Sequence, residues 1–177
     1  MAIWKSRGLR GSELEEVLNL TNEKYREQKL ALVQKIPTPI KPMEFDKEKH
    51  HITLAYFEQK STVDYIGTVQ GVPICFDAKE CSVDTFNLQN LHPHQVQYMT
   101  EFEEQGGVAF LIIFFKKRGQ YYYVPYQVMM EFWNRSQHGG KKSFHVDELE
   151  EKYQITVRNE LFVHYLERLS EDLDGRE

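Results

Sequence analysis

The sequence predicts an α/β protein with a mixed central β-sheet flanked by helices, in a single domain that spans residues 1–177. Residues 108–115 form an unbroken run of eight apolar side chains, which is typical of a strand covered on both faces. Segments with helical spacing of apolar residues lie before and after strand-like segments, and such helices pack on the faces of a sheet. A buried strand in a sheet between helices is therefore the expected architecture.

The chain is expected to begin with a helix over residues 12–29. Ser12 and Glu15 have the spacing of a capping box, and apolar side chains follow at helical intervals. The first predicted strand covers residues 30–33, after which three closely spaced prolines break any regular element. We expect residues 33–60 to leave the core as an insertion, because this segment is longer than an ordinary connection.

A β-hairpin follows, with strands over residues 63–69 and 72–80 joined by Gln70 and Gly71. A glycine in a two-residue loop is typical of a tight hairpin turn. The remaining predicted elements are a helix over residues 92–104, strands over residues 108–115 and 121–124, and short helices near residues 126–133 and 161–169.

This turn determines which residues of the two strands face each other. Asp64 is expected opposite Asp77, and Lys79 is expected on the same face as Asp77. Like charges directly opposite in a sheet are destabilising, and a divalent cation between the carboxylates removes that cost. Two carboxylates and a lysine are also the groups that metal-assisted phosphodiester hydrolysis requires. The alternative is a chance D-x-K triplet whose aspartates act only as turn or cap residues.

Magnesium is the expected cofactor of this hypothetical site. It prefers oxygen ligands in octahedral geometry and keeps several of its water molecules. The carboxylates of Asp64 and Asp77, the carbonyl of Ala78 and a scissile phosphate would complete such a site. Lys79 is then either an ammonium group beside the metal or an exposed strand lysine, and its position on the face of Asp77 favours the first role.

Composition and charge are compatible with a DNA-binding surface but do not require one. The net charge of −5 is uneven, because residues 144–177 carry −6 whereas residues 1–60 carry +2 and residues 61–143 carry −1. Affinity for the DNA backbone follows the local placement of lysine and arginine. The two cysteines are expected to be reduced thiols, no signal peptide precedes the polar N-terminus, and the longest apolar run is too short for a bilayer. These features predict a cytoplasmic protein.

The order of a helix with a glutamate, a strand-opening aspartate and a D-x-K strand resembles the PD-(D/E)xK nuclease superfamily. Over nearly the whole chain the sequence resembles the RecU-type Holliday junction resolvases. The blocks that carry this resemblance are Arg7-Gly8, Leu14-Glu15, Thr21-Asn22, Pro37-Thr38-Pro39-Ile40, Ala55-Tyr56-Phe57, Ser61-Thr62-Val63-Asp64-Tyr65, Phe76-Asp77-Ala78-Lys79-Glu80, Leu88-Gln89-Asn90-Leu91-His92, His94-Gln95 and Asp147-Glu148-Leu149-Glu150.

The resemblance implies a restriction-endonuclease-like core and a homodimer that cuts four-way DNA junctions by paired symmetric incisions with magnesium or manganese. It implies that residues 33–60 form a protruding stalk that reaches the junction centre. A recombinase is a further candidate partner. The alternatives are a non-cleaving protein that binds junctions or modulates a recombinase, and a related nuclease that acts on other branched DNA.

The resemblance also assigns roles to single residues. Asp64 and Asp77 correspond to the metal ligands, and Lys79 to the residue that orients or activates the attacking water. Glu15 corresponds to the helix glutamate that supports metal binding, although a capping box would explain it equally well. Gln95 lies where related nucleases carry a glutamine on the helix after the D-x-K strand.

Basic residues at two kinds of position are candidates for DNA contacts. Those on the predicted stalk are favoured, because a protruding charged element needs a partner. Those in two turns are equally well explained as solvated turn residues. The candidate DNA-binding residues are Lys35, Lys41, Lys47 and Lys49 on the stalk, and Lys116, Lys117, Arg118, Lys141 and Lys142 in the turns.

Overall fold

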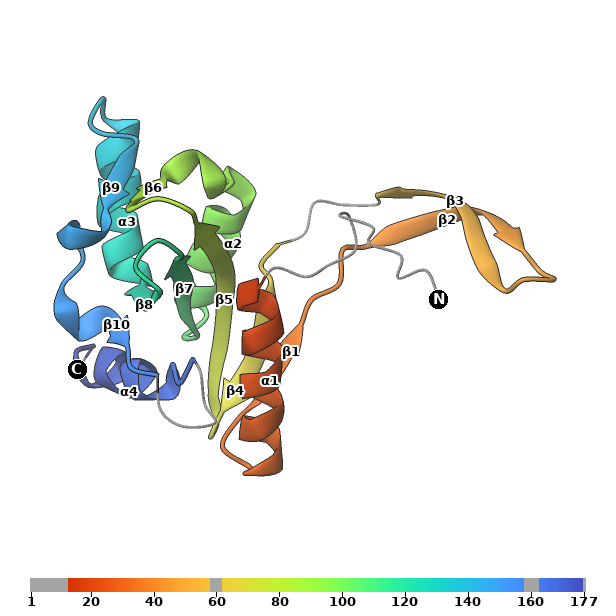
Figure 1. Cartoon of the computed structure of the whole chain (residues 1–177), viewed down its shortest axis with the longest axis horizontal. Coiled ribbons are helices and arrows are strands. Elements are labelled where there is room, and N and C mark those ends of the chain that lie inside the picture. The colour runs from red at the N-terminus through yellow and green to blue at the C-terminus, as the bar shows by residue number, and fades with distance from the viewer. Residues whose placement is uncertain (1–12, 58–61, 158–162, 177) are drawn as a thin grey trace.

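The structure is a computed structural model that describes residues 13–57, 62–157 and 163–176. A six-stranded sheet with the strand order β1-β4-β5-β7-β8-β10 forms its centre (Figure 1). The strands of this sheet are β1 (Leu32–Lys35), β4 (Tyr65–Val69), β5 (Val72–Cys81), β7 (Val108–Phe115), β8 (Gln120–Pro125) and β10 (Gln154–Ile155). The α-helices are α1 (Glu13–Glu27), α2 (Pro93–Glu104), α3 (Tyr126–Gln137) and α4 (Leu166–Asp174).

The sheet is mixed, as the sequence predicts. β5 and β7 pair in parallel, and helix α2 makes the crossover between them. The other neighbours in this sheet pair antiparallel. One apolar cluster joins α2 and α3 to one face of the sheet, and a second cluster joins α1 and α4 to the other face. The predicted class, a mixed sheet between layers of helices, is confirmed.

The β4–β5 hairpin forms in the predicted register. Gln70 and Gly71 make the turn with φ values of 49° and 93°, and Val69 pairs with Val72. Positive φ at both central residues matches the right-handed twist of the flanking strands. Ile66 pairs with Cys75, as the predicted loop requires, so the alternation of side chains along β5 is fixed as well.

The first strand and the last helix begin later than predicted. The first strand begins at Leu32 rather than at residue 30, because Lys29 adopts a left-handed φ of 58° and the Leu30 N–H still bonds the Tyr25 carbonyl at the end of α1. The last helix begins at Leu166, and residues 163–165 precede it in a turn. Residues 161 and 162 of that predicted helix, and Ser12 of the predicted capping box, lie outside the described residues.

Several short elements were not predicted, because two or three residues carry little periodicity. β6 and β9 form a separate two-stranded sheet beside α3. The unpredicted elements are β6 (Thr85–Asn87), β9 (Ser143–His145), β10, and the 3₁₀ turns η1 (Leu88–Asn90), η2 (Val146–Glu148) and η3 (Glu151–Tyr153).

Strands β2 (Ile40–Asp46) and β3 (His51–Phe57) form a separate hairpin that extends far from the sheet and helices (Figure 1). Its apolar side chains are largely exposed, as Phe57 shows with 78% exposure. The predicted start of the stalk was wrong, because residues 33–35 belong to β1 and pair with β4 in the central sheet. Residue 60, the predicted end of the stalk, lies outside the described residues. The single-domain organisation and the role of this hairpin stay predictions. None of the helices in the described part of the chain is both long and apolar enough to cross a membrane.

Candidate active site

Asp64 and Asp77 meet where β4 begins and β5 runs on beyond it. The Asp64 N–H donates to Asp77 Oδ1 at 3.2 Å, and the Ala78 N–H donates to Asp64 Oδ2 at 2.9 Å. The hairpin register that pairs Tyr65 with Phe76 places these residues one step further along both strands. The predicted juxtaposition of the two carboxylates is therefore present.

Asp77 is fully buried, with no exposed surface. Lys79 Nζ lies 2.5 Å from Asp77 Oδ2, and the lysine side chain is 18% exposed. Burial, together with repulsion from Asp64, raises the pKa of Asp77 to about 7 against the opposing effect of Lys79. The folded protein therefore disfavours the ionised form of Asp77 even with Lys79 beside it.

Gln95 connects this carboxyl pair to helix α2. Its Nε2 donates to both carboxylate oxygens of Asp77 at 3.0 Å, and its Oε1 accepts from the His92 N–H at 3.1 Å. Lys79 Nζ lies 3.5 Å from the same Oε1. Gln95 is 6% exposed, so its amide orientation is set by these partners. The helix thus positions both Asp77 and Lys79.

The donor set suits a hard cation with few protein ligands. A strand residue turns its N–H and C=O toward the same side. The Ala78 N–H bonds Asp64, so the Ala78 carbonyl points to that same side of β5. No group of three or more histidine, cysteine, aspartate or glutamate side chains gathers within metal-binding reach in the described ranges. Two carboxylates and a carbonyl match magnesium, which keeps several waters.

Glu15 is half-buried on α1, whose apolar side packs on the sheet face opposite to the cluster of α2 and α3. Its carboxylate pairs with Lys35 of β1, and its carbonyl accepts from the Tyr65 hydroxyl at 3.4 Å. These contacts hold α1 near the entrance of β4. The role of Glu15 at a metal stays a prediction, and Lys35, a predicted DNA contact, is an ion-pair partner of this residue.

Glu80 has a structural role that the sequence did not reveal. Its Oε1 accepts from the Leu14 N–H at 2.8 Å, at the first turn of α1, and its Oε2 lies 2.5 Å from Lys116 Nζ. A carboxylate at a helix N-terminus is stabilising. The signal available in the sequence was only its place directly after Lys79, because the partner helix is 66 residues away.

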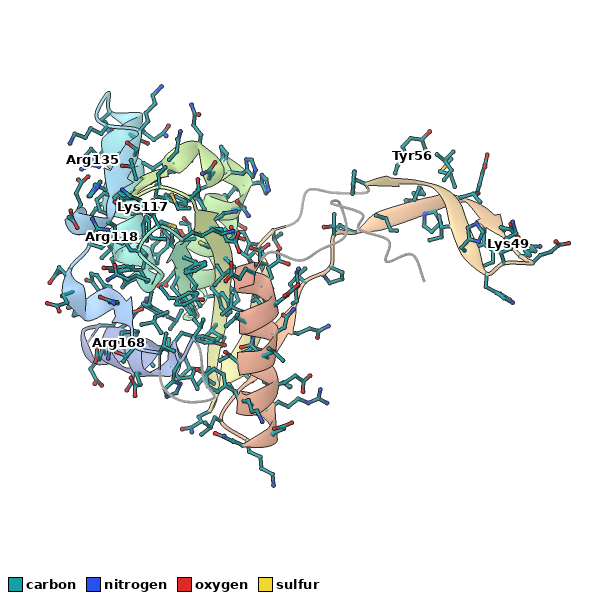
Figure 2. The ribbon with its side chains drawn as sticks, in the orientation of Figure 1. Lys49, Tyr56, Lys117, Arg118, Arg135 and Arg168 are labelled. Carbon is teal, nitrogen blue, oxygen red and sulfur yellow. The ribbon has the colours of Figure 1, made fainter. Side chains whose placement is uncertain are left out.

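The candidate DNA-binding residues fall into two groups. Lys41, Lys47 and Lys49 are exposed on the β2–β3 hairpin, and Figure 2 shows Lys49 near its far end. In the β7–β8 turn, by contrast, the three basic residues pair with acidic ones: Lys116 with Glu80, Lys117 with Asp84, and Arg118 with Asp84 and Asp147.

The other turn-borne pair, Lys141 and Lys142, is exposed before β9. The Lys142 carbonyl accepts from the Leu88 N–H at 3.0 Å, which ties this turn to η1. His92 and His94 stack with their ring centroids 5.4 Å apart at the start of α2. These basic and aromatic side chains lie close to the helix that carries Gln95.

Comparison with known proteins gives consistent matches over most of the chain. The family model described as "Recombination protein U" (RecU) matches residues 9–171. The Holliday junction resolvase RecU of Limosilactobacillus reuteri (strain DSM 20016) is 39% identical over 151 residues, covering 82% of this chain and 74% of the relative. That of Pediococcus pentosaceus is 36% identical over 173 residues, covering 95% and 86%.

A third relative, the Holliday junction resolvase RecU of Geobacillus kaustophilus (strain HTA426), is 40% identical over 145 residues, covering 80% of this chain and 72% of the relative. Among solved structures, Hjc, a Holliday junction resolvase from Archaeoglobus fulgidus, aligns with 66% of this chain and 78% of its own, at 13% identity and a TM-score of 0.43. Because the family model covers nearly all of the sequence and the relatives exceed one third identity over most of it, this chain belongs to the RecU family.

Proposed function

We propose that this protein is an endonuclease that resolves four-way (Holliday) DNA junctions in recombination and repair. Membership of the RecU family supports the substrate, since the curated relatives are named Holliday junction resolvases. The observation that carries the catalytic role is the buried Asp77 carboxylate, which faces Asp64 and has Lys79 Nζ at 2.5 Å. A protein that only binds DNA gains nothing from such a destabilising pair of carboxylates.

We propose magnesium or manganese as the cofactor. Asp64, Asp77 and the Ala78 carbonyl would hold it, and a bound divalent cation supplies stabilisation of charge at the scissile phosphate and a more acidic water. The raised pKa of Asp77 supports this assignment, because a cation would keep both carboxylates ionised at neutral pH. Lys79, on the same face, is placed to orient the water that attacks phosphorus.

Gln95 keeps these groups in place. Its amide nitrogen holds both Asp77 oxygens, and its amide oxygen accepts from the backbone of His92. Asp77 and Lys79 lie on β5 and Gln95 lies on α2, while Asp64, directly before β4, is tied to β5 by two hydrogen bonds. Such preorganisation keeps the reacting atoms within the narrow range that phosphoryl chemistry requires.

We propose that the working unit is a homodimer. Each chain has one Asp64–Asp77–Lys79 site, and two symmetric incisions need two sites related by a two-fold axis. A recombinase is the protein partner that we propose, because strand exchange produces the same branched DNA. The cytoplasm is the proposed location, and the free thiols of Cys75 and Cys81 support it.

The decisive experiment is cleavage of a labelled mobile four-way junction beside linear duplex of the same sequence, with magnesium and with chelator. We expect symmetric nicks in the junction alone, and none with chelator. Asp77→Asn is expected to keep junction binding and to lose cutting. Binding by the parent protein without cutting would instead favour an architectural role, and equal cutting of other branched substrates would favour a nuclease of broader specificity.

A further inference from the structure

A cavity of about 510 Å³ opens beside the start of helix α2. Its walls come from η1, the first residue of α2, the end of α3 and the turn before β9. In Figure 1 these segments lie at the end of the sheet toward which β5 points. The lining residues that matter for its chemistry are Gln89, Leu91, Pro93, Trp133, Gln137 and Lys142.

The cavity adjoins the candidate active site through the first turn of α2. Pro93 lines the cavity, and Gln95, two residues later, donates to Asp77 at 3.0 Å on the side facing the sheet. Two residues of an α-helix are separated by about 3 Å along its axis. His92, which precedes Pro93, donates its N–H to Gln95 Oε1. Residues two positions apart also point to opposite sides of the helix, so the cavity lies across the first turn of α2 from the proposed metal ligands.

The lining combines the groups that bind a nucleotide. Trp133 is half-buried: its indole packs against the apolar cluster of α2 and α3 and also lines the cavity, where an indole is a stacking surface for any base. The amides of Gln89 and Gln137 can donate and accept hydrogen bonds, and Lys142 contributes a cation for a phosphate. The volume falls within the range of small-molecule sites. The acidic side chains that neutralise the β7–β8 turn are not part of this lining.

We propose that this cavity binds one unstacked nucleotide of the junction, flanking the cut on the far side of the first turn of α2. Trp133 stacks on its base, the two glutamines contact the base edge, and Lys142 pairs with its phosphate. This inference rests on the proposed function, because it assigns the cavity to the same DNA substrate. Bases beside a junction are easier to unstack than those within a continuous duplex. The identity of the captured base then biases where along a mobile junction the enzyme cuts.

The matched variants for the test are Trp133→Phe, which keeps an aromatic ring, and Trp133→Leu, which keeps only apolar volume. Cut positions are mapped on a mobile junction with magnesium. We expect the parent and Trp133→Phe to share one pattern of preferred positions. With Trp133→Leu we expect cutting at those positions to fall about tenfold relative to the others, because loss of base stacking costs roughly 1–3 kcal/mol.

A second measurement reports occupancy directly. The chain has two tryptophans, so Trp4→Phe leaves Trp133 as its single indole fluorophore. A labelled junction in chelator reports binding by anisotropy, while Trp133 emission is followed in parallel. We expect emission to be quenched with the same midpoint as the anisotropy change, and 2-aminopurine to respond at one position beside the cut.

The outcomes separate this inference from the proposed function. Unchanged Trp133 emission at saturating junction, or the same cut pattern in the parent and in Trp133→Leu, would overturn the inference while junction cutting stands. Failure of the parent protein to bind or cut the junction would overturn both.

Discussion

The buried Asp77 carboxyl makes the stability of the metal-free protein depend on pH. Its pKa is about 7 in the folded protein and near 3.8 in an exposed aspartate. A group whose pKa is raised on folding binds its proton more tightly in the folded state. Its stabilising contribution is therefore complete below pH 4 and is lost as the pH rises to about 7.

The magnitude follows from the size of the shift. Between pH 5 and pH 7, a range of about two pH units, Asp77 is protonated in the folded state and ionised in the unfolded chain. Each unit corresponds to about 1.4 kcal/mol, so the expected loss between pH 5 and pH 8 is up to about 3 kcal/mol. Asp77 is fully buried, so solvent screening reduces this value little.

The assay is urea unfolding in chelator at pH 5 and pH 8, for the parent and for Asp77→Asn. The substitution removes the titrating group, and any loss of hydrogen bonds that is independent of pH cancels in the comparison. We expect the parent to lose up to about 3 kcal/mol more than the variant between the two pH values. Equal pH dependence of the two proteins would refute the buried carboxyl pair. Magnesium at pH 8 should raise the unfolding temperature of the parent more than that of the variant.

Three further changes test the site and the sheet. Lys79→Met should reduce cutting by about 100-fold or more while junction affinity stays within about twofold, because the lysine acts on the attacking water; nicking at the parent rate would exclude that role. Gln95→Ala should raise the magnesium concentration for half-maximal cutting by about 10-fold, as loss of a residue that orients a ligand does, and an unchanged metal dependence would limit Gln95 to packing. Gly67→Ala should destabilise the fold by about 2–4 kcal/mol in thermal or urea unfolding, because the added Cβ would lie 2.3 Å from the Leu32 carbonyl oxygen; a loss below about 0.5 kcal/mol would show that β1 shifts freely.

Elements with strong local signals could be predicted from the sequence. The apolar run of β7 coincides with the strand, and each of its residues is buried. The hairpin register followed from one glycine-containing turn, and that register correctly placed Asp64 beside Asp77. Both predictions rest on short-range rules, since side chains alternate along a strand and a two-residue loop fixes their pairing.

Contacts between distant segments could not be predicted in this way. The hydrogen bond from the Leu14 N–H to Glu80 joins residues 66 positions apart. The hydrogen bonds from Gln95 to Asp77 join residues 18 positions apart. Lys117 and Arg118 in the β7–β8 turn form ion pairs with Asp84, and no local sequence pattern predicts these pairs.

The sequence by itself determined the longer helices and strands of the core, the hairpin register and the identity of the carboxylates and the lysine, because these depend on neighbours along the chain. The tertiary structure alone decided how deeply Asp77 is buried, which amide holds it and which cavity forms across the first turn of α2. Burial and electrostatic repulsion act through space, so the raised pKa of Asp77 exists only once α2 packs against the sheet and removes this carboxyl from water.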